Sequence, residues 1–349
     1  MAKDSVGPKL LLAVFSALFS LAVLEAAVRF LPDSQRLLLR PSEIPGLAYG
    51  LEPGSTVLMP PGRFSVDAHG FRYPEFPAAK PAGEFRAFAL GDSIVFGQGT
   101  AKDDFVSVLE RDLNERRPPK LTAVRVVNTG VPSYSTCQEL ALLEKRLEGE
   151  FKPDLVLVGY ATNDPEGARV PFGLDLATGR IAPWWRAYHW VKGRSSLLKY
   201  AATKVSPLVV RLRGRSGFAP PVDPQQEVRY VSTLHDPAGP WWPKCAACLA
   251  GFGEYQKRGG APVLVVVFPL FDHLDSPELS AAYARVTKTA QDAGLAALNL
   301  EPAFKKLPPE TLAQYRGDGM HPSEDGHRFV AGLVRSYLDA HPALLKGRP

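Results

Sequence analysis

Short apolar runs that alternate with helical patterns constrain the fold of this chain more than any other feature. The third and fourth of five such runs are hydrophobic almost throughout, as is typical of parallel strands that are covered on both faces. Helical patterns, two of which begin with clear capping residues, lie between or after the runs, so we predict a parallel sheet with helices on both sides. The expected strands are 85–90, 124–128, 154–159, 263–268 and 295–300, and the expected helices are 103–117, 136–151, 277–294 and 323–340.

Residues that can carry out chemistry follow these runs. Ser93 comes just after the first expected strand, and Asp318 and His321 lie three residues apart in a late loop. A serine hydroxyl is a poor nucleophile until a base takes its proton, and the base needs a carboxylate to fix its tautomer. Active sites of parallel sheets form beyond the carboxyl ends of the strands, where Gly130 and Asn163 are also expected. The pattern therefore predicts a serine hydrolase or acyltransferase.

Four sequence blocks carry a resemblance to a known family. They are, in order, Gly91-Asp92-Ser93, Asn128-Thr129-Gly130, Gly159-Tyr-Ala-Thr-Asn163-Asp164 and Asp318-Gly-Met-His321-Pro322. Together they resemble the SGNH hydrolase superfamily, also called GDSL-like, over roughly residues 85–342. The resemblance implies a three-layer α/β/α, flavodoxin-like sheet of about five parallel strands. The N-terminal apolar stretch and His69-Gly70-Phe71-Arg72 further resemble membrane-anchored bacterial members.

The resemblance also implies residue roles that agree with general chemistry. Ser93 would attack an ester carbonyl, His321 would accept its proton and later donate one to the leaving group, and Asp318 would orient the imidazole. The backbone N–H groups of Ser93 and Gly130 and the side-chain amide of Asn163 would stabilise the oxyanion. No phosphate-binding loop or dinucleotide fingerprint appears at a strand–helix junction, and we expect no cofactor and no metal.

Each of these residues also has a structural interpretation. Ser93 could cap the helix that follows it, and Asn163-Asp164-Pro165 could be only a turn. Asp318 and His321 could form an ion pair within a loop. The joint order of the four blocks favours the catalytic interpretation. Three residues separate Gly159 from Asn163, more than in the compact form of the family motif, so the role of Gly159 is open.

Residues 10–31 have the length and composition of a membrane anchor. Residues 10–24 carry no charge. About 22 residues of helix span ~33 Å, which is enough to cross a bilayer. Glu25 and Arg29 stand at positions i and i+4, so we expect them to pair on one helix face near the membrane interface.

A cleaved signal peptide is the main alternative, because Lys3 and Lys9 precede an apolar run of suitable length. Small residues are poorly placed for cleavage, since Leu24 or Glu25 would occupy position −3. We favour an uncleaved anchor over a signal peptide and over a buried helix of a soluble protein. Basic residues flank both sides of the stretch, so charge alone does not fix its orientation. We expect a single-pass protein of the inner membrane with a periplasmic catalytic domain.

The chain divides into segments of different character. We expect an N-terminal tail (1–9), the anchor (10–31), a Pro- and Gly-rich juxtamembrane segment (32–84), a hydrolase domain (85–342) and a C-terminal tail (343–349). Residues 165–260, which we call the cap, interrupt the strand–helix alternation and contain all five tryptophans. Exposed aromatic side chains there could bind a glycan or lipid, although packing of the cap onto the core is the favoured explanation.

Charge and cysteine content bear on partners and bound groups. The net charge of +5 is small and mostly dispersed, and no segment resembles a nucleic-acid-binding module, so no nucleic-acid partner is expected. Three cysteines cannot all pair within one chain. Cys245 and Cys248 either form a local disulfide or are packed thiols, and a zinc site would need two further ligands. The sequence leaves the oligomeric state open.

Three functions are compatible with these features. The first is a membrane-anchored esterase that removes acyl groups, such as acetyl, from a glycan or lipid substrate. The second is an O-acyltransferase that passes the same acyl group to a hydroxyl of a cell-surface polysaccharide. The third is a non-catalytic envelope assembly protein that retains the fold, and the complete triad argues against it.

Overall fold

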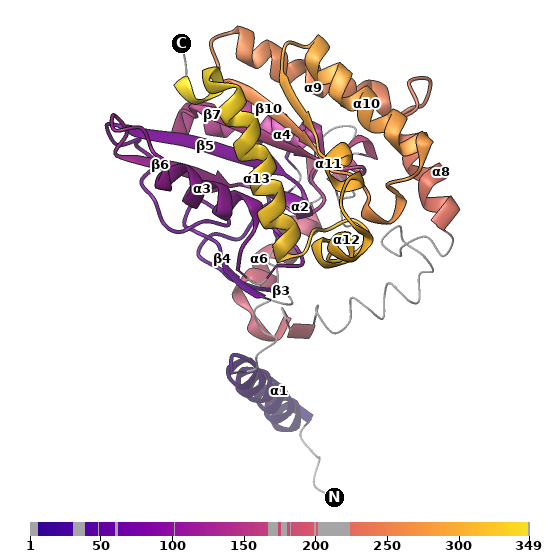
Figure 1. Ribbon diagram of the computed structural model, residues 1–349. Helices are drawn as coiled ribbons and strands as arrows, with labels where there is room; N and C mark the ends of the chain where they lie inside the picture. The colour runs from indigo at the N-terminus through magenta and orange to yellow at the C-terminus, as the bar shows by residue number, and fades with distance from the viewer. Residues whose placement is uncertain are drawn as a thin grey trace, which may run out of the picture.

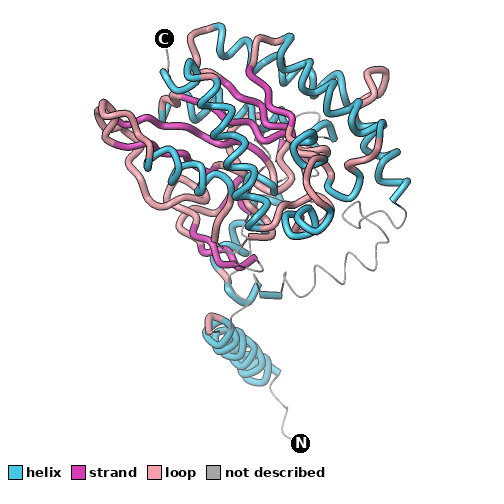
Figure 2. The backbone as a smooth tube through the Cα atoms, in the orientation of Figure 1, coloured by secondary structure: helices cyan, strands magenta, loops and turns pink. Residues whose placement is uncertain are grey.

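The computed structural model has a central sheet between two layers of helices, and its N-terminal helix projects from this domain (Figure 1). The structure describes residues 6–30, 39–47, 49–59, 62–100, 102–166, 174–175, 180–181, 183–198, 200–201 and 224–347. In Figure 2 the sheet strands run side by side through the middle of the domain, with helices in front and behind. The predicted three-layer α/β/α architecture is confirmed.

The five strands of the central sheet are parallel and lie in the order β11-β10-β7-β5-β6. They are β5 (Glu84–Gly91), β6 (Ala123–Asn128), β7 (Leu155–Tyr160), β10 (Val263–Val267) and β11 (Ala296–Asn299), each within one residue of its prediction. The strand order reverses between β5 and β7. At such a reversal the loops that follow the two strands diverge, and ligand sites of open α/β sheets form there.

Helices cover both faces of the sheet because β5 sends its side chains alternately into two cores. Phe85, Ala87 and Ala89 pack with α3 and α13, whereas Phe88 and Leu90 lie in the core that includes α4, α9 and α10. These helices are α3 (Phe105–Glu115), α4 (Thr136–Leu142), α9 (Trp242–Lys257), α10 (Pro277–Asp292) and α13 (Glu324–Ala340). A π-helical turn, Leu143–Leu147, joins α4 to α5 (Glu148–Phe151). The short helices are α2 (Ser93–Phe96), α11 (Glu301–Lys305) and α12 (Pro309–Tyr315).

The segment that precedes β5 packs onto the domain. It contains two antiparallel pairs, β1 (Leu39–Pro41) with β2 (Tyr49–Leu51) and β3 (Thr56–Met59) with β4 (Gly62–Ser65). Phe64 and Phe71 are buried in the same core as α4 and α9. The buried Arg72 guanidinium lies 3.7 Å from the Phe64 ring centroid and 3.4 Å from the Asp104 carboxylate. Arg72 also donates to the Phe96 carbonyl, so it ties this segment to the end of α2.

Among the described residues, only α1 (Val6–Val28) is long and apolar enough to cross a membrane. By length and composition it is a membrane span or a signal sequence. The helix begins and ends a few residues earlier than the predicted 10–31, and most of its large apolar side chains are exposed, whereas Val28 at its end is buried. The predicted pairing of Glu25 with Arg29 is confirmed, since the two side chains lie 3.5 Å apart.

Much of the predicted cap lies outside the described residues. The described parts are residues 165–166, β8 (Leu174–Asp175), β9 (Arg180–Ile181), α6 (Pro183–Arg194), residues 195–198 and 200–201, and residues 224–260, which include α8 (Pro224–Leu234) and α9. Helix α8 packs on α10, and α9 packs on α4 and β10. We therefore propose that the inserted segment ends before Pro224. Trp242 is 5% exposed and packs in the core, whereas Trp184 and Trp190 are 58% and 61% exposed.

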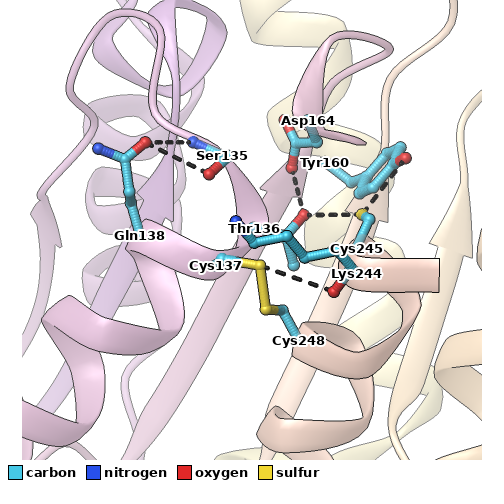
Figure 3. The surroundings of a disulfide bond; sticks show 9 residues. All are labelled: Ser135, Thr136, Cys137, Gln138, Tyr160, Asp164, Lys244, Cys245 and Cys248. Atoms are coloured by element: carbon cyan, nitrogen blue, oxygen red, sulfur yellow. Dashed lines mark hydrogen bonds between the residues drawn. A yellow bond between two sulfur atoms is a disulfide. The ribbon is translucent and has the colours of Figure 1, made fainter. Parts of the chain in front are cut away.

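The disulfide differs from the predicted local pair. Cys137, in the first turn of α4, is bonded to Cys248 of α9 (Figure 3). Cys245 is a buried free thiol whose Sγ lies 3.5 Å from Thr136 Oγ1. Both predicted alternatives were wrong for Cys248, because it is bonded to Cys137 and not to Cys245, whereas Cys245 is a packed thiol. The bond joins residues 111 positions apart, a separation that the Cys-x-x-Cys spacing cannot reveal.

The Cys137–Cys248 bond is expected to contribute about 4 kcal/mol to the free energy of unfolding, because it closes a loop of 111 residues. A Cys137→Ser/Cys248→Ser double variant should therefore unfold at a lower urea concentration than the wild type. Dithiothreitol should lower the wild-type midpoint and leave that of the double variant unchanged. Equal midpoints for the oxidised wild type and the double variant would contradict a stabilising role.

Candidate active site

The predicted site residues gather at the carboxyl edge of the sheet. Ser93 is the first residue of α2 and follows β5 with one residue between them. The loops after β6 and β7 leave the same edge and carry Gly130 and Asn163. The loop after α12 carries Asp318 and His321 to Ser93. Four separate segments of the chain therefore contribute to one site.

His321 connects the carboxylate to the serine. Its Nε2 lies 2.9 Å from Ser93 Oγ, and its Nδ1 lies 2.8 Å from Asp318 Oδ2. A carboxylate only accepts hydrogen bonds, so Nδ1 carries the proton and Nε2 presents a lone pair to the serine hydroxyl. In this tautomer the imidazole can remove the hydroxyl proton as the serine attacks a carbonyl carbon. The structure thus brings the three predicted residues together in the order that nucleophilic catalysis requires.

Asp318 is held by its own turn. Its Oδ1 accepts hydrogen bonds from the backbone N–H groups of Met320 at 2.8 Å and His321 at 2.6 Å. Partial burial alone would raise the pKa of Asp318, but the hydrogen bonds from the side chain and backbone of His321 lower it to about 2. Asp318 is therefore ionised at neutral pH, as a group that stabilises an imidazolium must be.

The short helix α2 fits against the sheet because three neighbours lack side chains. Gly91 and Gly159 are paired in register, and a Cβ on them would lie 2.1 and 2.3 Å from Val95 Cγ2. A Cβ on Gly130 would lie 2.3 Å from the backbone nitrogen of Phe96. Real Cβ atoms do not approach other atoms this closely, so each position requires glycine. Gly159, whose role the sequence left open, makes room for the first turn of the helix that carries the serine.

Asp92 precedes Ser93 and caps the helix that Ser93 begins. Its buried Oδ1 accepts the Ile94 N–H at 2.9 Å and so caps α2, while Ser93 Oγ lies 3.4 Å from Oδ2. Burial raises the pKa of Asp92, although the Ile94 N–H and the nearby His321 act in the opposite direction. Because Asp92 supplies the cap, the hydroxyl of Ser93 is not needed for that purpose and faces His321.

The two further predicted oxyanion donors lie beside α2. The side-chain amide of Asn163 is hydrogen-bonded to Asp92. A primary amide has two N–H donors, so this contact leaves the second for a substrate oxygen. The Gly130 N–H donates to Asn128 Oδ1 at 3.0 Å, so its use as an oxyanion donor requires that bond to be exchanged. The geometry therefore favours Asn163 over Gly130 as the readier donor.

The loop that follows Gly130 was not singled out by sequence reasoning. Ser133 has a φ of 65°, a left-handed conformation that residues other than glycine rarely adopt and that is often found at functional sites. The hydroxyl of Tyr49, in β2, donates to the carbonyl of Pro132 at 2.8 Å and contacts the Ser133 side chain. The juxtamembrane segment thus holds this loop in place. The left-handed conformation of Ser133 could not be predicted, because serine at a position in a sequence does not indicate a positive φ.

Buried acidic residues, Glu139 and Asp164, lie close to Asp92, the neighbour of Ser93. Asp164 Oδ2 accepts the Thr136 hydroxyl at 2.7 Å (Figure 3). Burial, with the charges of Asp164 and Asp92, raises the pKa of Glu139 well above its usual range, and burial with Asp92 does the same for Asp164. Within the described part of the chain, neither carboxyl oxygen of Glu139 has a hydrogen-bond partner. We expect Glu139 to be neutral, which limits the negative charge beneath Ser93.

His235 extends this polar network away from the site. Its Nε2 lies 2.8 Å from the Tyr160 hydroxyl, and its Nδ1 lies 2.8 Å from the Val231 carbonyl oxygen. Since the carbonyl can only accept, Nδ1 carries the proton and Nε2 accepts from Tyr160. Burial lowers the pKa of His235 to about 4, so the ring is neutral in the folded protein at neutral pH.

The stabilising contribution of His235 is expected to be lost as the pH falls from about 6.5 to about 4. In this window the unfolded chain binds a proton at the imidazole and the folded chain does not. Urea unfolding at several pH values should show that the stability difference between wild type and His235→Phe shrinks by about 3 kcal/mol between pH 7 and 4. A difference that does not change with pH would show that His235 titrates alike in both states.

Comparison with known proteins identifies one family. Residues 89–329 match the model of the GDSL-like Lipase/Acylhydrolase family. This range covers more than half of the chain and includes all five predicted site residues, Ser93, Gly130, Asn163, Asp318 and His321. No curated protein matches the chain.

Several solved structures are similar at low sequence identity. LAE5, an alpha/beta hydrolase enzyme from the metagenome of Lake Arreo, is 15% identical with a TM-score of 0.42, over 74% of this chain and 96% of that one. The lipase/acylhydrolase from Enterococcus faecalis is 18% identical with a TM-score of 0.36, over 74% and 96% of the two chains. A two-domain esterase active on acetylated mannans is 14% identical with a TM-score of 0.39, over 77% of this chain and 52% of its own length. This chain thus spans about half of that esterase, and the family model carries the assignment.

Proposed function

This chain belongs to the GDSL-like lipase/acylhydrolase family of ester-bond hydrolases, and we propose that it is a serine esterase that removes acyl groups from a glycan or lipid of the cell envelope. The observation that carries the proposal is the continuous hydrogen-bonded series from Asp318 through His321 to Ser93. It lies at the sheet edge where sites of this fold form. The series supplies a nucleophile, a base and a group that orients the base.

The proposed reaction passes through a covalent acyl-enzyme. His321 Nε2 takes the proton of Ser93 as Oγ attacks the ester carbonyl, and Asp318 stabilises the imidazolium that forms. The tetrahedral intermediate collapses, and the imidazolium gives its proton to the departing alcohol. Water then attacks the acyl-enzyme with the same base, which releases the carboxylic acid and restores the serine. The second N–H of Asn163 and the N–H of Ser93 stabilise the negative oxygen of each intermediate, with Gly130 as a further proposed donor.

Replacement of Asn163 by alanine is expected to lower kcat by about 10²- to 10³-fold with little change in KM, because the lost hydrogen bond forms mainly in the transition state. Steady-state hydrolysis of p-nitrophenyl acetate measures this directly. Asn114→Ala, on the distant helix α3, is a control for general loss of stability. A rise in KM with unchanged kcat would assign Asn163 to substrate binding in place of oxyanion stabilisation.

The substrate class is tested with a panel of acetylated polysaccharides and p-nitrophenyl esters of increasing acyl length. Release of acetate from a polysaccharide, with little activity on long-chain esters, would support the deacetylase form of the proposal. Preference for long acyl chains would favour a lipid substrate. Adding a glycan acceptor to an acyl donor tests the alternative of acyl transfer, because a transferase forms an acylated glycan at the expense of free acid. If the acceptor becomes acylated and no free acid forms, the acyltransferase alternative would replace the esterase proposal.

We further propose that α1 is a retained single-pass anchor of the inner membrane and that the catalytic domain faces the periplasm. The Cys137–Cys248 disulfide supports an oxidising compartment, since such bonds are rare in the cytosol. Contacts of Glu25 with the cap support retention of α1, because cleavage would remove them. A phosphatase fused after Pro349 should be active in intact cells, and activity only of a cytosolic reporter would contradict this topology.

A further inference from the structure

The last turns of α1 are tied to the cap by a single carboxylate. Glu25 accepts hydrogen bonds from the Ser195 hydroxyl at 2.8 Å, the Ser196 N–H at 2.7 Å and the Leu197 N–H at 3.0 Å. Residues 196–198 are helical, so the carboxylate caps the start of this helix from another part of the chain. Arg29 pairs with the same carboxylate. These contacts therefore fix the position of residues 195–197 relative to the end of α1.

This contact sets the depth of the cap relative to a bilayer. Glu25 lies three residues before the end of α1 at Val28, about 4.5 Å along the axis. A paired carboxylate at the end of a spanning helix lies near the interface, since deeper burial in hydrocarbon is costly. Groups within hydrogen-bond distance of Glu25 must lie at the same depth relative to the bilayer. Residues 195–197 are thus placed where α1 leaves the membrane.

Helix α6, which precedes residues 195–197, exposes side chains that are typical of the membrane–water interface. Figure 1 shows α6 at the end of the domain that faces α1. Trp184 is 58% exposed, Trp190 61% and Val191 43%. The Arg194 guanidinium lies 4.1 Å from the Trp190 ring centroid. Tryptophan rings gather at membrane–water interfaces, and arginine can keep its charge at the headgroups while its stem covers apolar surface.

The charge of this part of the sequence favours an anionic surface. Residues 176–222 contain nine Lys or Arg and no Asp or Glu, although the whole chain has a net charge of only +5. Basic residues beside a membrane span are attracted to anionic headgroups. Of this range, the structure describes residues 180–181, 183–198 and 200–201, which contain four of the nine basic residues, and residues 195–197 contact Glu25 at the end of α1.

We propose that α6 lies in the headgroup region of the bilayer that α1 crosses and binds anionic phospholipid there. The inference rests on the proposed retention of α1 as an anchor. Two attachments, the span and the interfacial helix, would prevent the domain from rotating about α1 and would hold the active site at a fixed height above the membrane. A glycan bound by the same exposed tryptophans would instead leave α6 in water.

The experiment compares three alanine-to-cysteine variants of the full chain, each labelled with an NBD fluorophore in phosphatidylcholine–phosphatidylglycerol vesicles. Ala17 reports the middle of α1, Ala187 reports α6, and Ala340 is a matched exposed position at the far end of α13. The unsubstituted chain gives the background labelling of the buried thiol of Cys245. Quenching is measured with lipids that carry a nitroxide either near the headgroup or deep in the acyl chain.

The proposal expects a different response at each position. The Ala187 label should be quenched mainly by the shallow nitroxide, the Ala17 label mainly by the deep one, and the Ala340 label by neither. A quenched Ala17 label with an unquenched Ala187 label would retain the anchor and overturn this inference. Failure of quenching at both positions would overturn the anchor proposal and the inference with it. Quenching at Ala187 that is equal in pure phosphatidylcholine would overturn the requirement for anionic lipid.

A second variant tests the side chains themselves. In Trp184→Ser/Trp190→Ser, shallow quenching of the Ala187 label should fall severalfold while quenching of the Ala17 label is unchanged. Trp241→Ser, which removes an exposed tryptophan outside α6, is the matched control and should leave both signals unchanged. Unaltered shallow quenching in the double variant would show that the exposed rings do not hold α6 at the membrane.

Discussion

Replacement of Ser93 by alanine is expected to reduce ester hydrolysis by about 10⁴- to 10⁶-fold, because no other group in the site can form the acyl-enzyme. The hydroxyl is only 2.9 Å from His321 Nε2, and Asp92 provides the cap of α2, so the fold does not depend on it. Hydrolysis of p-nitrophenyl acetate gives the rate. Labelling by a fluorophosphonate probe should occur in the wild type and disappear in the variant.

The matched control is Ser336→Ala, on the exposed side of α13, which should keep both activity and labelling. Circular dichroism and the urea midpoint should show that Ser93→Ala is as well folded as this control. A well-folded wild type that hydrolyses esters without reacting with the probe, and a Ser93→Ala variant that retains its rate, would together refute the serine nucleophile.

Replacement of His321 by alanine should cause a loss of similar size, since the serine then has no base and the leaving alcohol no acid. In the wild type, kcat/KM should fall by about tenfold per pH unit on the acid side, as a protonated imidazole cannot accept the hydroxyl proton. The pKa of Asp318 is lowered to about 2, so this carboxylate stays ionised over the same range and does not cause the fall. The pH–rate profile from pH 5 to 8 measures the effect.

His341→Ala is the matched control, because this exposed histidine follows α13 and should not affect turnover. The acid-side fall should be absent from the small residual rate of His321→Ala. A wild-type profile that is flat from pH 5 to 8, or a His321→Ala variant that keeps the wild-type rate, would remove His321 from the role of general base.

Much of the sheet could be predicted because its signals are local. A strand that is covered on both faces must be apolar along its whole length, so β7 and β10 were visible as uninterrupted runs. The signals for helix starts were also local, since Ser276 caps α10 through its own side chain. Ser93, Asp318 and His321 could be proposed because their residue types and their places after strands and loops are sequence features. The hydrogen bond between His321 and Ser93, however, joins residues 228 positions apart in the chain.

The features that the sequence missed depend on contacts between distant segments. The partner of Cys248 is Cys137, across the gap between α4 and α9, and no spacing rule encodes that pair. Gly159 makes space for Val95, a residue on another element, so its purpose cannot be read from its own neighbours. The left-handed backbone of Ser133 is likewise imposed by its surroundings.

By itself the sequence determined an α/β fold with its strand positions, an apolar N-terminal helix and a set of residues suited to acyl chemistry. Each of these follows from patterns within one element or from the type of a single residue. Only the tertiary structure decided that the serine faces the imidazole and that Glu25 is hydrogen-bonded to the cap. It also decided which glycines leave space for α2 to pack against the sheet. The physical reason is that hydrophobic periodicity specifies an element and its buried face, whereas hydrogen bonds and close packing between elements depend on where the folded chain brings them.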